Sequence, residues 1–132
     1  MASRIKGITI EIGGDTTGLD QALKKVDGTI KDTQEDLKEI NKALKLDPGN
    51  TELLEQKQRS LASAIDATSE KLKELKEAQK QAQEQLARGD ISQEQYDAMQ
   101  REIVETEQKL KGLEEEYKNF GSVQAQQIAA AG

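Results

Sequence analysis

The fold of this chain is decided by residues 44–54, which read LKLDPGNTELL. The stretch contains the only proline, Pro48, and a proline can neither continue a helix nor leave the preceding residue, Asp47, in the α region. Gly49 permits a tight turn, and the side chain of Asn50 can cap a following helix by accepting from its first amides. These four residues predict a turn that folds two helices back on each other.

Apolar residues recur at alternating steps of three and four on both sides of this turn, which is the spacing of a coiled-coil seam. The first helix is expected over about residues 17–46. The second is expected over about residues 51–87, and it ends at Arg88-Gly89-Asp90. The seam of the first helix consists of Leu19, Leu23, Val26, Ile30, Thr33, Leu37, Ile40 and Leu44. The seam of the second consists of Leu54, Gln58, Leu61, Ile65, Thr68, Leu72, Leu75, Gln79, Ala82 and Leu86.

A third helix, over about residues 93–119, has the clearest start signal in the chain. Ser92 and Gln95 have the spacing of a capping box, and Ile91 before the cap can pack on Tyr96. We expect Gly121 to end or loosen this helix, and residues 121–132 to begin a further segment of a longer protein. The seam consists of Tyr96, Met99, Ile103, Thr106, Leu110, Leu113, Tyr117 and Phe120.

Some seam positions are polar, and they weaken the seam. Two interpretations stay open for them: they are merely tolerated, or they fix the register of the helices or face a cavity. The residues concerned are Thr33, Gln58, Thr68, Gln79 and Thr106.

The N-terminal residues have a different period. Ile8, Ile10 and Ile12 alternate with polar residues, which indicates a strand, and Gly13-Gly14-Asp15 ends it. No other stretch has a strand pattern, and a lone strand leaves its backbone groups unpaired. We therefore expect residues 1–15 to pair with the same strand of another copy, through Ile8, Ile10 and Ile12. The alternative is an arm that is ordered only in a larger assembly.

Short connections make neighbouring helices antiparallel, and an aromatic content of 2% is too low for a thick core. The expected fold class is therefore mainly α. An N-terminal β-strand precedes two or three long antiparallel heptad helices, over residues 16–120, in an elongated coiled-coil hairpin or bundle.

Composition excludes several classes of site. The chain has no cysteine and no histidine, so it can form no disulfide, no zinc site with these ligands and no histidine general base. A net charge of −6 with mixed signs argues against nucleic-acid binding. No apolar run approaches the roughly 20 residues of a membrane helix. We expect a soluble protein made in the cytoplasm, with no cofactor, no catalytic site, and no nucleic-acid or membrane partner in this region.

Three short motifs have simple structural explanations. The glycine-rich stretch 13–18 lacks the ending of a phosphate-binding loop, which favours a strand-to-helix turn. Residues 88–90 spell the adhesion tripeptide Arg-Gly-Asp at a point where a helix must end. The acidic run 114–116 lies beside Lys111 and Lys118 and is typical of a solvated helix flank.

Three blocks of the sequence resemble the N-terminal region of tail tape measure proteins of Gram-positive tailed phages and prophages. They are residues 2–19 (ASRIKGITIEIGGDTTGL), residues 46–54 (LDPGNTELL) with Gln56-Lys57, and residues 120–132 (FGSVQAQQIAAAG). The resemblance implies a structural, non-enzymatic protein that lies in the lumen of the virion tail tube, sets tail length and is made in the host cytoplasm. It also implies a homo-oligomer whose other partners are tail assembly chaperones and the tail tube protein.

The long apolar segments that many tape measure proteins carry are absent here, so the resemblance extends to the N-terminal part only. A different class also fits the pattern of helices. It is a helical-hairpin binding module, such as a cytoplasmic adaptor or chaperone that grips its clients between helices.

Overall fold

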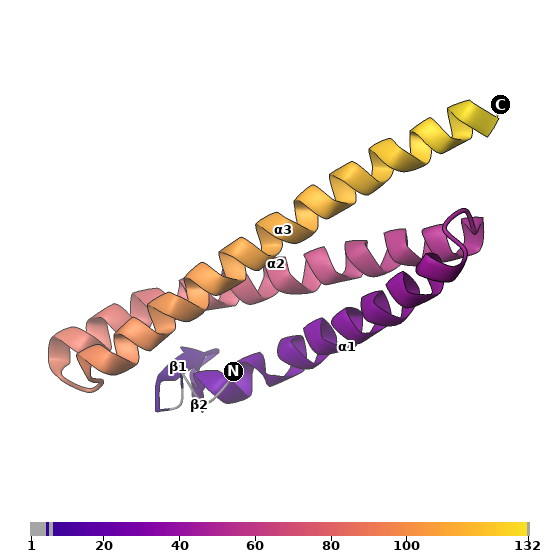
Figure 1. Cartoon of the computed structure of the whole chain (residues 1–132). Coiled ribbons are helices and arrows are strands. Elements are labelled where there is room, and N and C mark those ends of the chain that lie inside the picture. Colours follow the sequence, from indigo (N-terminus) through magenta and orange to yellow (C-terminus); the bar gives the residue numbers. More distant parts are fainter. Residues whose placement is uncertain (1–4, 6, 132) are drawn as a thin grey trace.

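Three long helices follow a small β-hairpin in an elongated molecule (Figure 1). The computed structural model describes residue 5 and residues 7–131, except for the side chains of residues 121–131. The elements are β1 (Thr9–Ile12), β2 (Asp15–Gly18), α1 (Leu19–Leu46), α2 (Thr51–Arg88) and α3 (Gln93–Ala131). Helix α2 packs against both α1 and α3, and successive helices run antiparallel. The mainly α, elongated fold class expected from the sequence is confirmed.

The turn between α1 and α2 forms as its residues predict. The amide of Asp47, the C-cap of α1, donates to the carbonyl of Ala43 at 3.1 Å. The side chain of Asn50 is the N-cap of α2, because its Oδ1 accepts from the amide of Leu53 at 3.0 Å. Its Nδ2 also donates to Oδ2 of Asp47 at 3.1 Å, so one side chain connects the two helix ends.

Replacing this cap should destabilise the hairpin measurably. We expect Asn50→Ala to lower the free energy of unfolding by about 1 kcal/mol, since the amide of Leu53 loses its acceptor. Asn119→Ala is the matched control, because Asn119 is exposed inside α3, where alanine is the better helix former. Urea denaturation of both variants checks the prediction, and equal midpoints would contradict it.

The connection between α2 and α3 also follows its local sequence. Gly89 caps α2 in the left-handed region (φ 81°), which favours glycine. Ser92 and Gln95 form the expected capping box. The amide of Ser92 donates to Oε1 of Gln95 at 2.8 Å, and the amide of Gln95 donates to Oγ of Ser92 at 3.1 Å.

The predicted end of the third helix is wrong. Helix α3 continues through Gly121 to Ala131, so residues 121–131 are continuous with it. That residues 121–132 begin a further segment of a longer protein stays a prediction. A single glycine costs a helix only about 1 kcal/mol relative to alanine, and the alanines and glutamines that follow are good helix formers. Gly132 lies outside the described residues.

The N-terminal strand has a partner within the chain, which corrects the prediction that no second strand exists. β1 and β2 are antiparallel, with Ile10 opposite Thr17. Gly13 (φ 59°) and Gly14 (φ 87°) form the two-residue turn, whose positive φ values are those of hairpin turns that match the strand twist. Residues 13–18 are therefore a hairpin turn and a strand. Residues 1–4 and 6 of the predicted arm lie outside the described residues.

The buried side chains form two apolar clusters along the molecule. The first joins the β-hairpin to the neighbouring ends of the helices, and the second lies nearer the α1–α2 turn. The first cluster contains Ile5, Ile8, Ile10, Leu19, Leu23, Leu75, Ala78, Ala82, Ile91, Met99 and Ile103. The second contains Leu37, Leu54, Leu61, Ala64 and Phe120.

Most of these residues lie on the predicted seams, but α2 also buries a set of alanines that the prediction missed. Ala64, Ala67 and Ala78 are buried, whereas the predicted seam residues Ile65 and Leu72 are only half-buried. A helix between two neighbours needs a second contact face, and small side chains let the neighbouring backbones approach.

Candidate functional site

A layer of charged side chains crosses the bundle at the boundary between the two apolar clusters. We call Asp27, Lys71 and Glu102 the ion layer; α1, α2 and α3 contribute one residue each. Nζ of Lys71 lies 2.7 Å from Oδ1 of Asp27 and 2.8 Å from Oε1 of Glu102. One ammonium group therefore holds the central helix to both of its neighbours.

The ion layer is largely withdrawn from solvent. The side chains of Lys71 and Glu102 are 13% and 6% exposed, and that of Asp27 is 32% exposed. Burial alone would lower the pKa of Lys71. The hydrogen bonds and negative charges of Asp27 and Glu102 outweigh it, so the pKa of Lys71 is raised above its ordinary value of 10.5. The ammonium form is therefore the form that this layer stabilises.

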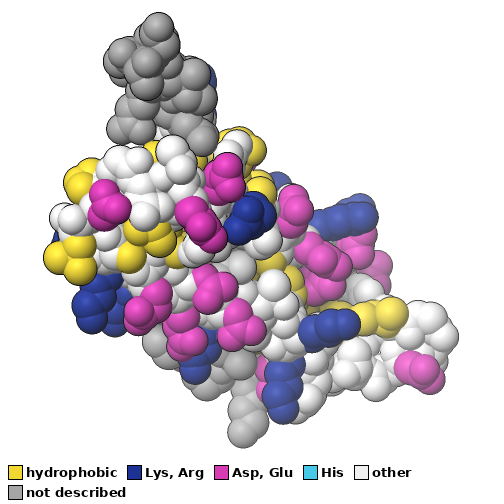
Figure 2. Space-filling model, turned by 90° about the vertical axis from the view of Figure 1, so that its right-hand side faces the viewer, with side chains coloured by type: hydrophobic (Ala, Val, Ile, Leu, Met, Phe, Trp, Pro, Cys, Tyr) yellow, Lys and Arg dark blue, Asp and Glu magenta, His cyan; other side chains and the backbone are white. Residues whose placement is uncertain are grey.

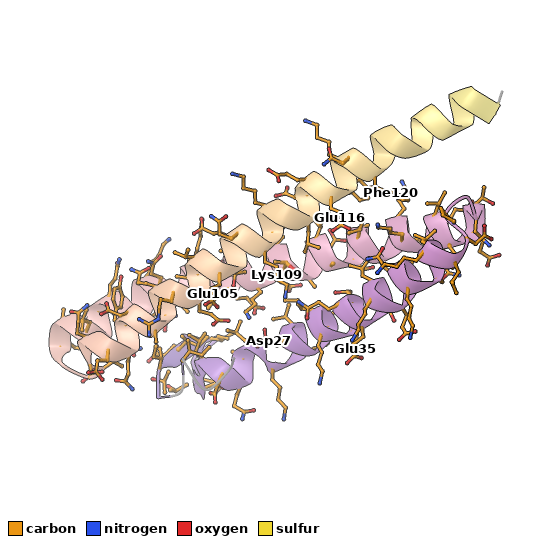
Figure 3. The ribbon with its side chains drawn as sticks, viewed as in Figure 1. Asp27, Glu35, Glu105, Lys109, Glu116 and Phe120 are labelled. Carbon is orange, nitrogen blue, oxygen red and sulfur yellow. The ribbon has the colours of Figure 1, made fainter. Side chains whose placement is uncertain are left out.

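A second lysine, Lys109, interacts electrostatically with the ion layer. Figure 3 shows Asp27 of α1 and Lys109 of α3 in the space between those two helices. Partial burial and the positive charge of Lys71 lower the pKa of Lys109, although Asp27 and Glu102 act in the opposite direction. Two carboxylates and two ammonium groups thus share this level of the bundle.

The polar seam residues divide between the two interpretations left open by the sequence. Thr33 and Thr106 are buried and donate to carbonyls of their own helices, both at 2.7 Å, so they are tolerated. In contrast, Nε2 of Gln79 donates to Oε1 of Gln100 at 2.9 Å and connects α2 to α3 at one register. Thr68 is fully buried, and its hydroxyl has no hydrogen-bond partner among the described residues. Gln58 is half-buried.

Acidic residues line the side of α2 that faces a groove of about 460 Å³ between α1 and α2. Ala22 and Val26 of α1 form part of its wall, together with Glu70 and Glu74 of α2. Burial raises the pKa of Glu74, and the charges of Glu70, Glu77 and Asp27 raise it further. Deprotonated Glu74 is therefore a source of repulsion in the folded state.

Removing that charge should stabilise the protein at neutral pH. We expect Glu74→Gln to raise the free energy of unfolding at pH 7 by less than about 1 kcal/mol, because like charges at helical spacing cost about 0.2–0.5 kcal/mol per pair. A raised carboxyl pKa means that the folded state binds the proton more tightly. As the pH falls below the raised pKa, Glu74 becomes protonated in the wild type. The difference in free energy of unfolding between the variant and the wild type therefore shrinks. Urea denaturation at pH 7 and pH 4 measures it, and a variant equally stabilised at both values would contradict it.

The strand residues predicted to mediate self-association are mostly buried in their own chain. Ile8 and Ile10 belong to the first apolar cluster, whereas Ile12, next to the hairpin turn, is 57% exposed. Ile8 and Ile10 therefore cannot form an intermolecular face while this core is intact. Pairing between copies stays a prediction.

The other short motifs have structural roles. Arg88 and Asp90 pair with each other across the turn after α2, with Nε and Oδ2 3.0 Å apart. Glu116 of the acidic run lies 3.6 Å from Nζ of Lys57, which also lies 5.6 Å from the ring centre of Phe120. Figure 2 shows acidic and basic side chains intermixed over one end of the molecule.

The described part of the chain contains no group of three or more acidic residues placed to hold a metal ion. Within it, no helix is long and apolar enough to cross a membrane. Comparison with protein families, with curated proteins and with solved structures finds no match to this chain.

Proposed function

We propose that this chain is the N-terminal part of a tail tape measure protein of a tailed phage or prophage. In this role it is a structural, non-enzymatic component that lies in the tail tube lumen and helps to set tail length. Its partners would be further copies of itself, tail assembly chaperones and the tail tube protein, and it would be made in the host cytoplasm.

One observation carries the proposal. Two of the three sequence blocks that resemble tape measure proteins coincide with junctions of the fold, and the third lies inside α3. The first block contains the β-hairpin and the first residue of α1, the second contains the α1–α2 turn, and the third is the C-terminal part of α3. At the two junctions the local sequence sets the course of the chain, whereas the helices between the blocks have the general pattern of any coiled coil.

The physical form suits a ruler. A helix lengthens by 1.5 Å per residue, so the 38 residues of α2 span about 57 Å. The helices contact each other along narrow seams, and the ion layer and polar seam residues interrupt the apolar contact. We propose that this makes the bundle easy to open for passage through a tube. The isolated chain should then unfold in the mesophilic range of about 45–65 °C, and a far higher midpoint would contradict this part of the proposal.

The function is tested in tails. Mass spectrometry of tails purified from a phage or induced prophage that carries this reading frame should detect peptides of this chain. An in-frame deletion of 21 helical residues should shorten the tails by about 30 Å if those residues are part of the ruler. Tails of unchanged length that lack these peptides would overturn the proposal.

The groove between α1 and α2 favours a second candidate, a helical-hairpin binding module such as a cytoplasmic adaptor or chaperone. It has a volume of about 460 Å³, and its lining combines Ala22, Val26 and Ala67 with charged side chains, so it could accept an amphipathic side chain of a client. An adaptor or chaperone would be absent from finished tails, so the same mass spectrometry separates the two functions.

A further inference from the structure

The outer edge of β1, which faces away from β2, is covered by side chains of α2. The amide of Glu11 donates to Oε1 of Gln81 at 2.7 Å, and Nε2 of Gln81 donates back to the carbonyl of Glu11 at 3.2 Å. Nε2 of Gln85 donates to the carbonyl of Thr9 at 2.6 Å. The backbone groups of Thr9 and Glu11 thus point away from β2, and two glutamines one helical turn apart bond three of these four groups.

The contact of Gln81 imitates a neighbouring strand. In an antiparallel sheet, a hydrogen-bonded residue pair exchanges one N–H···O bond in each direction. The side-chain amide of Gln81 makes this same pair of bonds with the backbone of Glu11. All three glutamine bonds are solvent-exposed, so strand bonds could replace them at small net cost.

We propose that the outer edge of β1 is a pairing site for β1 of a second copy, and that Gln81 and Gln85 keep it closed in the monomer. The second strand is antiparallel and centred on Ile10, which places Thr9 opposite Glu11 of the other copy and Glu11 opposite Thr9. Each of these pairs exchanges two backbone hydrogen bonds. The two-fold symmetric pair of strands therefore satisfies the edge-facing amides and carbonyls of Thr9 and Glu11 in both copies.

The second copy is favoured as occupant by this self-complementarity. The residues whose backbone groups face this edge are Thr9 and Glu11. In the register centred on Ile10, the hydroxyl of Thr9 in each copy lies opposite the carboxylate of Glu11 in the other. Centring the pair on Glu11 would instead place two carboxylates opposite each other, which is unfavourable. A half-open hollow of about 630 Å³ lies beside the edge, and Thr9, Glu11 and the two glutamines are among the residues that line it. The inference does not depend on a role in phage tails.

Removing the two glutamines tests whether they close the edge. We expect Gln81→Ala with Gln85→Ala to tighten the dimer at least tenfold in sedimentation equilibrium of the full chain. The matched control is Gln34→Ala with Gln108→Ala, because these glutamines are exposed on α1 and α3. Its dimerisation should equal that of the wild type. A double variant of Gln81 and Gln85 that associates no more tightly than this control would overturn the proposal.

Substitutions of Thr9 test the register and separate a second copy from any other surface. The side chain of Thr9 is exposed, so the monomer tolerates both charges. Thr9→Lys creates two opposite-charge pairs with Glu11 across the two-fold axis, and Thr9→Glu creates two like-charge pairs. At low salt, we expect the Thr9→Lys dimer to have a dissociation constant at least about tenfold lower than that of the Thr9→Glu dimer.

Both Thr9 variants are also measured without the glutamine substitutions, so the register test does not require the double variant to fold. Far-UV circular dichroism verifies that the helices are intact. Association that does not respond to the charge at position 9 would place the dimer contact elsewhere and overturn the proposal.

Discussion

Lys71→Ala is expected to lower the free energy of unfolding by about 3 kcal/mol. The substitution removes the ammonium group that lies between Asp27 and Glu102 and leaves two carboxylates facing each other in the bundle. Breaking a buried ion pair on one side costs about 3–5 kcal/mol, since the remaining charge stays desolvated. The lower end applies here because Asp27 is about one-third exposed.

Lys73→Ala is the matched control. Lys73 is on the same helix two residues away and is exposed, so its loss should change stability by less than about 0.5 kcal/mol. A further variant combines Lys71→Met with Asp27→Asn and Glu102→Gln. It should recover most of the loss, because neutral amides and a methionine cost less to desolvate than unpaired carboxylates do. Urea denaturation at pH 7 measures all three variants, and equal costs for Lys71→Ala and Lys73→Ala would refute the role of the ion layer.

The contribution of the ion layer also has a defined pH dependence. Because the folded state raises the pKa of Lys71 above 10.5, folding favours the protonated form. The stability this lysine contributes is fully present below pH 10.5 and is lost as the pH rises through the raised value. The difference between wild type and Lys71→Ala should therefore shrink above pH 10.5.

The parts of the fold that the sequence predicts are those with local causes. The α1–α2 turn depends on Asp47, Pro48 and Asn50, which are close together in the chain, and the α3 start depends on Ser92 and Gln95. The seams follow from a repeated spacing that is visible without any knowledge of partners. For these elements, local preference and the final contacts agree.

The β-hairpin was missed because β2 has no strand signal of its own. Asp15-Thr16-Thr17-Gly18 contains no apolar residue, and its pairing comes from the Gly13-Gly14 turn and from the amide of Leu19, which donates to the carbonyl of Ile8 at 2.8 Å. Two glycines after an alternating run are a known hairpin signal, so the turn could have been found from the sequence.

The ion layer could not have been predicted in the same way. Asp27 directly follows a seam position, Glu102 directly precedes one, and both resemble ordinary solvated charges in the sequence. They meet Lys71 only because the lengths of two connections set the relative heights of three helices. The glutamine contacts to β1 also join residues about 70 positions apart, which no local pattern encodes.

Leu75→Ala and Leu61→Ala are expected to lower the free energy of unfolding by about 3 kcal/mol each. Both side chains are fully buried, Leu75 in the first apolar cluster and Leu61 in the second, and truncating a buried leucine costs about 2–5 kcal/mol. Leu46→Ala is the control. Leu46 is the last residue of α1 and is 88% exposed, so its truncation should change stability by less than about 0.5 kcal/mol.

The double variant tests whether the two clusters act as separate parts of one cooperative fold. Leu61 and Leu75 are 14 residues apart on α2, or about 21 Å, and they belong to different clusters. The costs of substitutions this far apart usually add within about 0.5 kcal/mol, so the double variant should lose about 6 kcal/mol. Small domains have only about 5–15 kcal/mol in total, and the double variant should therefore be at or near the point of unfolding. Denaturation followed by circular dichroism measures the wild type, the three single variants and the double variant. A double-variant loss well below the sum of the single losses would mean that one substitution already disrupts both clusters, and that the ion layer does not separate them.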